Sequence, residues 1–370
     1  MSDRTADQVF LVVAPGLESL LAEECRELDL PVLETETGGV SLGPGADLFR
    51  ANLGLRLATR VLLRVASFEA RHFSELSKRA RDVPWERFLR PGDGLELRVT
   101  SKKSKLYHQD AIAERLLEAA TRRVTVAAAD AVPDERRQAF VVRLHRDRVS
   151  VSVDSSGELL HRRGYRLEGG KAPLRETLAA ALLRASGWDP RAPLVDPFMG
   201  SGTVPIEAAM LARRIAPGLG RRFAFERWPD FDRRVWDAIV DRARSVVVPA
   251  AGPIVGSDRD AGAVAIARAN AERAGVAADL SLEQRALSEV EPQAGPAWLV
   301  TNPPYGARIG EVAALRNLYA RLGQIRRERF AAGSATLLTA DRALERALGC
   351  PTQARFETRN GGLLVRCVSF

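Results

Sequence analysis

The spacing of apolar and polar positions divides the chain into two regions that differ in how predicted strands and helices follow one another. In the first region, short alternating or β-branched runs predict strands, and apolar residues three and four positions apart predict helices. The predicted strands are 9–13, a short run bracketed by glycines at 38–39 and 43–45, 59–68, 95–100, 139–145 and 149–154, and the predicted helices are 17–28, 47–53, 73–81 and 107–120. Strands and helices are mixed in this region, and it has no glycine-rich loop of the kind that binds nucleotides. We therefore predict an α+β region.

After a polar, glycine-containing linker at 161–173, the pattern changes to a regular alternation of strands and helices. The predicted strands are 194–196, 254–256, 280–283, 298–300 and 335–338, the predicted helices are 174–186, 204–213, 261–274 and 315–329, and 211–250 is an arginine-rich insertion. This alternation predicts an α/β domain whose mostly parallel sheet carries helices on both faces. We place the boundary between the two regions near 160–172.

Composition excludes several classes of protein. The chain has 370 residues, of which 46% are hydrophobic, so we expect more than one domain. No apolar run approaches the roughly 20 residues of a membrane span, and the N-terminus shows no secretory signal. The three cysteines, Cys25, Cys350 and Cys367, are far apart, and the four histidines, His72, His108, His145 and His161, make no metal-ligand pattern. We therefore expect a cytoplasmic protein without a metal site.

Charge is distributed unevenly along the chain. The net charge is +8, yet residues 1–50 hold 3 basic and 10 acidic side chains, whereas residues 51–150 hold 21 basic and 13 acidic ones. Arginine excess alone says little, because the chain has 50 arginines and only 5 lysines. Three of those lysines, Lys102, Lys103 and Lys105, fall in one SKKSK run. This run is either a contact for a polyanion such as RNA or a solvated turn.

A glycine-rich loop follows the first strand of the second region, in LVDPFMGSGTVPIEAAM at 194–210. Gly200 and Gly202 let the backbone turn sharply and approach a ligand, and the following helix offers free N–H groups. The loop lacks the lysine of a P-loop and the spacing of a dinucleotide fingerprint. Asp258, after the next strand, is either a carboxylate for ribose hydroxyls or the N-cap of helix 261–274.

A second unusual loop, TNPPYG at 301–306, follows the predicted strand 298–300. The Asn302 side chain and the carbonyl of Pro303, held by the stiff Pro303–Pro304 backbone, can both accept hydrogen bonds. Two such acceptors would localise the lone pair of a purine amine, and Tyr305 would stack on a base lifted out of its helix. The alternative interpretation is a rigid loop with a core tyrosine. Arg308 either touches a phosphate or faces solvent.

These motifs together resemble a known family. DPFMGSGT, an acid after the next strand and NPPY are typical of S-adenosylmethionine-dependent amino-group methyltransferases. HRRGYR at 161–166, APLRETLAAAL at 172–182, IEAAM at 206–210 and TNPPYG are similar to the bacterial 23S rRNA guanine-N2 methyltransferases and the related tRNA enzymes. The resemblance implies a ferredoxin-like segment at 1–58, a THUMP RNA-binding domain at 59–160 and a Rossmann-like class I methyltransferase domain at 161–370.

The resemblance also implies a set of cofactor contacts for S-adenosyl-L-methionine. It places the methionine part of the cofactor against a set of residues in the first loop, the ribose against Asp258, and the reactive methyl group near Asn302. The first-loop set consists of Asp196, Met199, Gly200, Ser201, Gly202 and Thr203. The family's acid for the adenine amine falls at Ala286, which cannot accept a side-chain hydrogen bond. We therefore expect packing, the backbone of Ala286 and Leu287, or a neighbour such as Arg285 to hold the adenine.

The expected function is formation of N2-methylguanosine in 23S rRNA, by a monomer that binds structured RNA. One alternative is the same chemistry on tRNA. DNA adenine-N6 and release-factor glutamine methyltransferases share these motifs but usually lack a basic α+β front region. A non-catalytic RNA-binding or ribosome-assembly protein with a degenerate cofactor site is a further alternative, and Ala286 is the feature that favours it.

Overall fold

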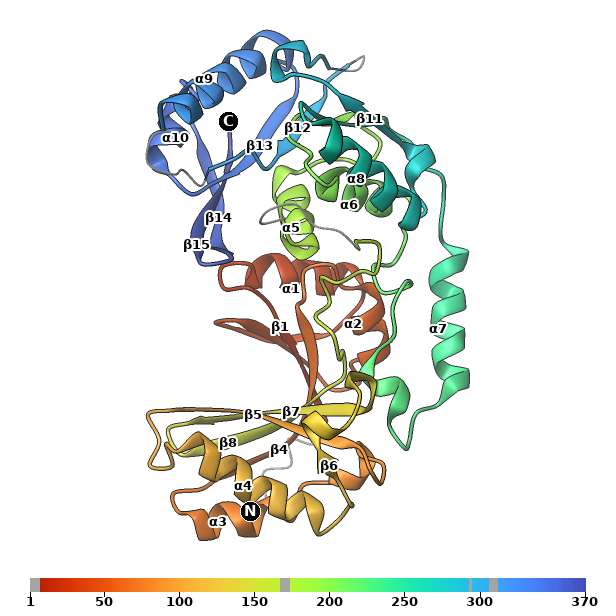
Figure 1. Cartoon of the computed structure of the whole chain (residues 1–370), viewed down its shortest axis with the longest axis vertical. Coiled ribbons are helices and arrows are strands. Elements are labelled where there is room, and N and C mark those ends of the chain that lie inside the picture. Colours follow the sequence, from red (N-terminus) through yellow and green to blue (C-terminus); the bar gives the residue numbers. More distant parts are fainter. Residues whose placement is uncertain (1–6, 167–173, 293–294, 306–311) are drawn as a thin grey trace.

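The computed structural model describes residues 7–166, 174–292, 295–305 and 312–370. Its strands form two sheets, and Figure 1 shows the first region below the second. Within the described ranges, none of the helices combines the length and the apolar character needed to cross a membrane.

The first region is built on one eight-stranded sheet with the order β2-β3-β1-β4-β8-β7-β5-β6. Its strands are β1 (Gln8–Val12), β2 (Val32–Glu36), β3 (Gly39–Leu42), β4 (Arg60–Glu69), β5 (Gly94–Lys102), β6 (Ala127–Ala128), β7 (Arg137–His145) and β8 (Arg148–Asp154). The long strand β4 pairs antiparallel with β1 on one side and with β8 on the other. This one strand therefore makes the sheet continuous from β2 to β6.

Four helices cover the first sheet: α1 (Glu18–Glu27), α2 (Leu48–Gly54), α3 (Phe73–Ala80) and α4 (Gln109–Thr121). In Figure 1, α1 and α2 lie between the two sheets, whereas α3 and α4 lie on the far side of the first sheet. Each helix buries an apolar stripe, as Leu76 and Ala80 do in α3. Asp47 caps α2, because its carboxylate accepts the N–H of Phe49 at 2.9 Å.

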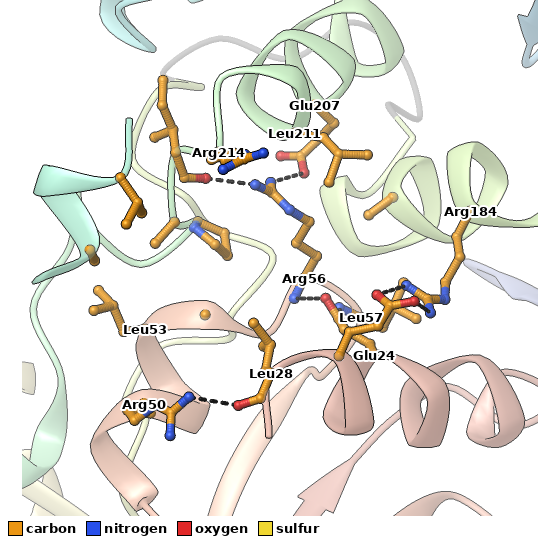
Figure 2. Close-up of a pocket in the computed structure, with 18 of the residues that line it drawn as sticks. Glu24, Leu28, Arg50, Leu53, Arg56, Leu57, Arg184, Glu207, Leu211 and Arg214 are labelled. Atoms are coloured by element: carbon orange, nitrogen blue, oxygen red, sulfur yellow. Dashed lines mark hydrogen bonds and ion pairs between the residues drawn. The ribbon is translucent and has the colours of Figure 1, made fainter. Parts of the chain in front are cut away.

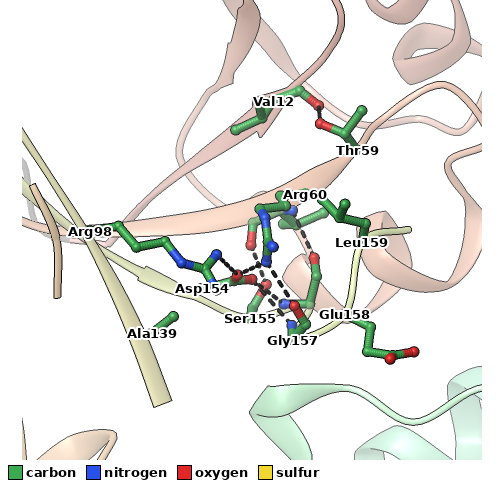
Figure 3. Close-up of polar contacts among 12 residues, drawn as sticks. Val12, Thr59, Arg60, Arg98, Ala139, Asp154, Ser155, Gly157, Glu158 and Leu159 are labelled. Carbon is green, nitrogen blue, oxygen red and sulfur yellow. Dashed lines mark hydrogen bonds and ion pairs between the residues drawn. The ribbon is translucent and has the colours of Figure 1, made fainter. Parts of the chain in front are cut away.

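A buried carboxylate joins three strands of this sheet (Figure 3). Asp154, at the end of β8, is fully buried and accepts the backbone N–H groups of Ser156 at 2.9 Å and Gly157 at 3.2 Å. Arg60 of β4 pairs with it directly, and Arg98 Nη1 of β5 lies 3.7 Å from its Oδ2. Burial raises the pKa of Asp154, and the charge of Arg60 opposes that rise. Because a buried charge is costly unless it is paired, the strands depend on this junction.

The second region contains a seven-stranded sheet with the order β11-β10-β9-β12-β13-β15-β14. Strands β9 (Leu194–Asp196), β10 (Ile254–Asp258), β11 (Leu280–Gln284), β12 (Trp298–Thr301) and β13 (Ser334–Thr339) are parallel, whereas β14 (Gln353–Asn360) and β15 (Leu363–Ser369) form an antiparallel hairpin on β13. The order of the strands reverses at β9, with β10 on one side and β12 on the other. Ligands bind outside the carboxyl ends of strands at such a reversal.

Successive residues of these strands bury on opposite faces, as a strand requires. Leu194 and Ile254 belong to a core that includes α5 (Glu176–Ser186), α6 (Thr203–Ala212) and α8 (Ala261–Arg273). Val195 and Val255 belong to a core that includes α9 (Val312–Arg329) and α10 (Arg342–Ala347). The predicted mostly parallel sheet with helices on both faces is therefore confirmed, as is the α+β front region.

Several elements lie outside the prediction: the short strands β2 and β6, helix α10, the β14–β15 hairpin, and α7 (Arg233–Ser245) within the insertion. The helical spacing of Trp236, Ile239, Val240 and Ala243 was present in the sequence of α7, but alternating charges hid it. In the hairpin, only Phe356 and Thr358 of β14 are buried, because its other face is open to solvent. Elements with a narrow buried face leave a weak periodic signal.

Candidate active site

Three parallel strands end in polar side chains at the same edge of the second sheet. Asp196 ends β9, Asp258 ends β10, and Thr301 ends β12 directly before Asn302. Asp196 is 1% exposed, and its Oδ1 accepts the Thr301 hydroxyl at 2.6 Å and the Phe198 N–H at 3.1 Å. This hydrogen bond ties the start of the glycine-rich loop to the start of the NPPY loop. The structure thus brings the two predicted loops together.

The glycines of the first loop are required by its geometry. Gly202 has a φ of 84°, and a Cβ there would lie 2.9 Å from Cβ of Ala267 in α8. Gly200 has a φ of 50°, but a Cβ there would meet nothing within 4 Å. Its N–H donates to Asp258 Oδ2 at 3.1 Å. The loop therefore packs tightly on α8 at Gly202 and leaves open space at Gly200, where a ligand can approach the backbone.

Asp258 does not cap the following helix, so that alternative is wrong. The N-cap of α8 is Asp260, whose carboxylate accepts the Gly262 N–H at 2.8 Å. Asp258 instead accepts the N–H groups of Gly200 and Asp260, one on each oxygen. Each carboxylate oxygen has a second lone pair, so the group can still accept hydrogen bonds from two adjacent hydroxyls.

The NPPY loop presents an acceptor that no described residue uses. Asn302 Oδ1 is buried and has no hydrogen-bond partner among the described residues. Pro303 is buried and Pro304 is exposed. Tyr305 is half-buried, and its hydroxyl accepts the Nδ2–H of Asn360 at 2.8 Å. Because a buried unpartnered acceptor is costly, the Asn302 oxygen is suited to a donor supplied by a ligand.

Burial controls the charge of this edge. It raises the pKa of Asp196 to about 7, a rise that Asp258 reinforces and the hydrogen bonds from Thr301 and the Phe198 N–H oppose. Burial also raises the pKa of Tyr305, and its hydrogen bond with Asn360 opposes that effect. A positive group beside Asp196 would stabilise its carboxylate form. These carboxylate and amide acceptors therefore fit a cation that also carries hydroxyl donors, as S-adenosylmethionine does.

A buried ionic cluster supports the first loop from beneath, and the sequence patterns did not reveal its purpose. Thr203 Oγ1, at the start of α6, accepts Nη2–H of Arg166 at 2.6 Å, and the same Nη2 lies 3.3 Å from Glu176 Oε1. Glu207 Oε1 accepts the Tyr165 hydroxyl at 3.3 Å and Nε–H of Arg163 at 3.5 Å. Burial raises the pKa of Glu176 to about 7. The motifs at 161–166, 172–182 and 206–210 thus meet in space.

The remaining predicted loop residues contribute packing and backbone contacts. Met199 is buried, and its sulfur would lie 2.7 Å from a Cβ at Gly256. Ser201 is half-buried, and its carbonyl accepts Nδ2–H of Asn270 at 2.9 Å. These contacts hold the loop against β10 and α8.

Ala286 and Leu287 lie beside this edge, after β11, but the Ala286 backbone is already engaged. Its N–H donates to Glu289 Oε2 at 3.1 Å, and its carbonyl accepts the Glu289 N–H at 3.0 Å. Leu287 is half-buried and packs against the second core. The role of these two residues toward an adenine stays a prediction.

The predicted RNA contacts lie at the edge of the first sheet, in a different part of the molecule. Lys102 is exposed at the end of β5, and Lys103 and Lys105 are exposed in the loop that follows. The N–H of Lys105 donates to Asp147 Oδ1 at 2.7 Å, and the N–H of Asp147 donates to Ser104 Oγ at 3.0 Å, so this loop is fixed to the β7–β8 turn. Figure 1 places β5 and β7 in the lower half of the molecule. The predicted contact Arg308 lies outside the described residues.

Sequence reasoning missed an aromatic pair beside this lysine loop. Tyr107 is 67% exposed, and its ring centroid lies 4.1 Å from that of His108. The turn between β7 and β8 adds exposed Arg146 and Arg148 to the same basic surface. Exposed aromatic rings among cations are typical of surfaces that bind unpaired nucleotides. The signal in the sequence was the Tyr107–His108 dipeptide two residues after SKKSK.

A cavity of about 1160 Å³ is lined by residues of α1, α2, α5, α6 and α7 (Figure 2). Arg56 lies at its base, where its Nη2–H donates to the Ile215 carbonyl at 2.6 Å and its Nη1 lies 3.7 Å from Glu207 Oε2. Nη2–H of Arg163 donates to the Arg56 carbonyl at 2.7 Å. None of the predicted site residues that the structure describes lines this cavity. Its base therefore serves to join the first region to the second.

Comparison with known proteins agrees with this geometry. A family profile described as "RMKL-like, methyltransferase domain" matches residues 163–367, and one described as "RlmL ferredoxin-like domain" matches residues 8–62. A candidate RNA methyltransferase of Synechocystis sp. is 35% identical over 97% of this chain and 95% of its own length. The ribosomal RNA large subunit methyltransferase K/L of Syntrophotalea carbinolica is 37% identical over 98% of this chain but 53% of its own length.

The chain thus spans about half the length of the K/L relatives that it matches. A solved structure described as SMU.472, a candidate methyltransferase complexed with SAH, superposes with a TM-score of 0.87 at 32% identity. That superposition covers 98% of this chain and 97% of the other.

Proposed function

This chain belongs to the family of RMKL-like methyltransferases that use S-adenosyl-L-methionine, and from that premise we propose that it methylates the exocyclic N2 amine of a guanine in 23S rRNA. The observation that carries the proposal is the buried Oδ1 of Asn302, which has no hydrogen-bond partner among the described residues and follows Thr301, the residue that donates to Asp196. RNA as the class of substrate is supported by the names of the relatives from Synechocystis and Syntrophotalea.

Each residue of the site has a separate role in the proposed reaction. The cofactor supplies a methyl group on a positively charged sulfur. Gly200 lets the backbone come close to the ligand, and Gly202 lets the loop pack on α8. The Asp196 carboxylate faces positive charge, and the Asp258 carboxylate accepts the ribose hydroxyls. Positioning of this kind contributes roughly 7–11 kcal/mol in favourable systems.

The nucleophile needs activation because the lone pair of a guanine amine is delocalised into the ring. Asn302 Oδ1 and the Pro303 carbonyl accept the two N–H groups and localise that lone pair toward the methyl carbon. When bound, S-adenosyl-L-methionine would supply its methyl carbon to this nitrogen with the sulfur as leaving group, and the surplus amine proton would leave to water. The Tyr305 ring stacks on the extruded base, and the Asn360 hydrogen bond keeps that ring in place.

In this proposal, the basic surface of the first region binds the RNA. Lys102, Lys103 and Lys105 contact phosphates, and Tyr107 stacks on an unpaired base. We assign residues 1–58 to a ferredoxin-like segment, 59–160 to a THUMP domain and 161–370 to the methyltransferase domain. Arg308 remains a proposed phosphate contact.

Mapping of modified nucleosides in a deletion strain tests this function. We expect one N2-methylguanosine to disappear from 23S rRNA in the deletion strain and to return with the wild-type gene but not with Asn302→Ala. Unchanged rRNA and tRNA would contradict the proposal. Loss of the mark from tRNA alone would transfer the same chemistry to the tRNA alternative.

A further inference from the structure

The β14–β15 hairpin projects past the edge of the sheet at which the candidate site lies. The last residue pair between β13 and β15 is Thr339 with Arg366. Beyond it, the hairpin continues through the pairs Arg359 with Leu364 and Asn360 with Leu363. Because β13 is parallel to β9 and β12, this overhang extends from the carboxyl edge of the sheet.

The tip of this overhang is apolar and uncovered in the described structure. Leu363 is 51% exposed and Leu364 is 59% exposed, whereas the next residue, Val365, is buried. Adjacent residues of a strand point to opposite faces, so the tip presents a leucine on each side. Scattered exposed leucines are ordinary, but two in succession at a projecting turn form a continuous apolar edge.

The tip is also connected to the catalytic loop. Asn360, at the end of β14, donates its Nδ2–H to the Tyr305 hydroxyl at 2.8 Å. The leucine pair is therefore separated from Tyr305 by Asn360 and the Gly361–Gly362 turn. An apolar edge at this place lies beside the ring proposed to hold an extruded base.

We propose that Leu363 and Leu364 form a wedge that enters the base stack of the RNA as the target guanine leaves it. This inference rests on the proposed function, because it concerns the RNA around the same pocket. A base taken out of a helix leaves its neighbours unstacked, and an inserted apolar side chain covers their exposed faces. The Asn360–Tyr305 hydrogen bond then links the wedge to the stacking ring.

The charges around the tip favour RNA over a protein partner. Arg359, exposed next to the turn, donates Nη1–H to the Gly362 carbonyl at 3.2 Å and has further N–H groups for a flanking phosphate. Arg355 is exposed farther back on β14, where its Nε–H donates to Ser369 Oγ at 2.9 Å. Glu357, the acid between them, lies 3.0 Å from Arg366 Nε through its Oε1. The hairpin thus combines apolar side chains at its turn with two cations behind it, as proteins that kink nucleic acids do.

The test uses the RNA hairpin that carries the nucleotide identified by the deletion-strain mapping. One version pairs the target guanine with cytosine, and a second places an abasic residue opposite the target, so that no base pair must be broken. Transfer of labelled methyl groups is measured for the full-length wild type and for the double variant L363S/L364S. We expect the variant to lose about ten-fold or more in rate on the paired RNA and to recover to within about two-fold on the abasic RNA.

Matched variants separate the wedge from general damage. Leu33→Ser changes a leucine of β2 that is 60% exposed, and it should leave both rates unchanged. L363M/L364M keeps an apolar tip and should retain the rate on paired RNA. Equal rates for wild type and L363S/L364S on paired RNA overturn the wedge, as does an equal loss on both RNAs. If the wild type methylates neither RNA, the proposed function fails, and the wedge fails with it.

Discussion

At the scale of single residues, the site depends on polar atoms that are buried before any ligand arrives. Asn302 Oδ1 lacks a partner among the described residues, and Asp196 is buried beside Thr301 with only neutral donors on its oxygen. Such groups reduce folding stability, because desolvation of a polar atom is offset only by a hydrogen bond or an opposite charge. The chain retains them at the edge where a ligand can supply both.

Asn302→Ala tests the acceptor directly. We expect kcat to fall by about 100-fold or more, because removal of one preorganised group at a reacting centre has this effect in other enzymes. Calorimetric titration should show S-adenosylmethionine binding largely retained. Full activity of this variant would contradict the proposed activation of the amine.

Tyr305 has two separable roles, and two substitutions distinguish them. Tyr305→Phe keeps the ring and loses the hydrogen bond from Asn360, so we expect only a few-fold loss in kcat/KM for RNA, since a neutral hydrogen bond contributes about 1 kcal/mol. Tyr305→Ala also loses the stacking face, which contributes about 1–3 kcal/mol per base, and should cost roughly 5–150-fold. Equal losses in the two variants would show that the ring does not stack.

Asp196 makes stability depend on pH. Its pKa is about 7 in the folded protein, whereas an unfolded aspartate titrates near 4, so between these values only the folded state holds the proton. The contribution of Asp196 to the free energy of unfolding should therefore be greatest below about pH 4 and fall, by an amount on the order of a few kcal/mol, as the pH rises through 7.

Urea titrations of the ligand-free protein at several pH values measure this dependence. Asp196→Asn cannot titrate, so its unfolding free energy should lack the decline assigned to this group. A decline of the same size in both proteins would assign the effect to other groups.

At the scale of elements, the parallel strands and their helices could be predicted because both sides of each strand are buried. The runs at 194–196, 254–256 and 298–300 matched β9, β10 and β12 almost to the residue. The β14–β15 hairpin could not be predicted in this way, because exposed arginines and leucines interrupt its alternation. Its Asn360–Gly361–Gly362 turn was the available signal.

The candidate site could be predicted only where a motif carried chemistry. The loops containing Gly200 and Asn302 were located from the sequence, and the structure places both at one edge. The supports of these loops were not recognised, because Arg166 reaches Thr203 and Asn360 reaches Tyr305 across long separations in the chain. Contacts of this kind follow from the fold and leave no local pattern.

The Asp154 junction is the element-scale feature whose loss should be most costly. Asp154→Ala leaves Arg60 partly buried without its carboxylate, and we expect a loss of about 3–5 kcal/mol in the free energy of unfolding. Arg98→Met removes the more exposed and more distant cation and should cost less than about 1 kcal/mol. Urea unfolding of both variants measures the difference, and similar losses would contradict the assignment of Asp154 as the centre of the junction.

At the scale of the whole molecule, the proposed RNA contacts and the candidate active site lie at different points of one joined body. Arg56 and Arg163 connect the first region to the second through partly buried hydrogen bonds. The lysine loop and the Tyr107–His108 pair lie on the first sheet, and the pocket lies on the second. The contribution of the first region should therefore be measurable as affinity, apart from catalysis.

The triple variant K102Q/K103Q/K105Q tests that separation. We expect weaker binding to 23S rRNA and a salt dependence of log affinity whose slope is smaller by about 2, because each lost phosphate contact removes about 0.7–0.9. The rate at saturating RNA should change little. Lys78→Gln, at an exposed position on α3, is the matched control, and an unchanged salt slope in the triple variant would remove the lysines from the interface.

The pairing of β4 with both β1 and β8 has a consequence for how an RNA would be selected. A hinge between β1 and β8 would let the lysine loop move relative to the rest of the molecule, and the enzyme could then bind RNAs of many sizes. The shared strand, together with the hydrogen bonds of Arg56 and Arg163 between the two regions, would instead keep the distance between the proposed lysine contact and the candidate site constant. The substrates would then be RNAs whose folded shape spans this distance. Lengthening the stem between the lysine contact and the target guanine would move that guanine away from the candidate site.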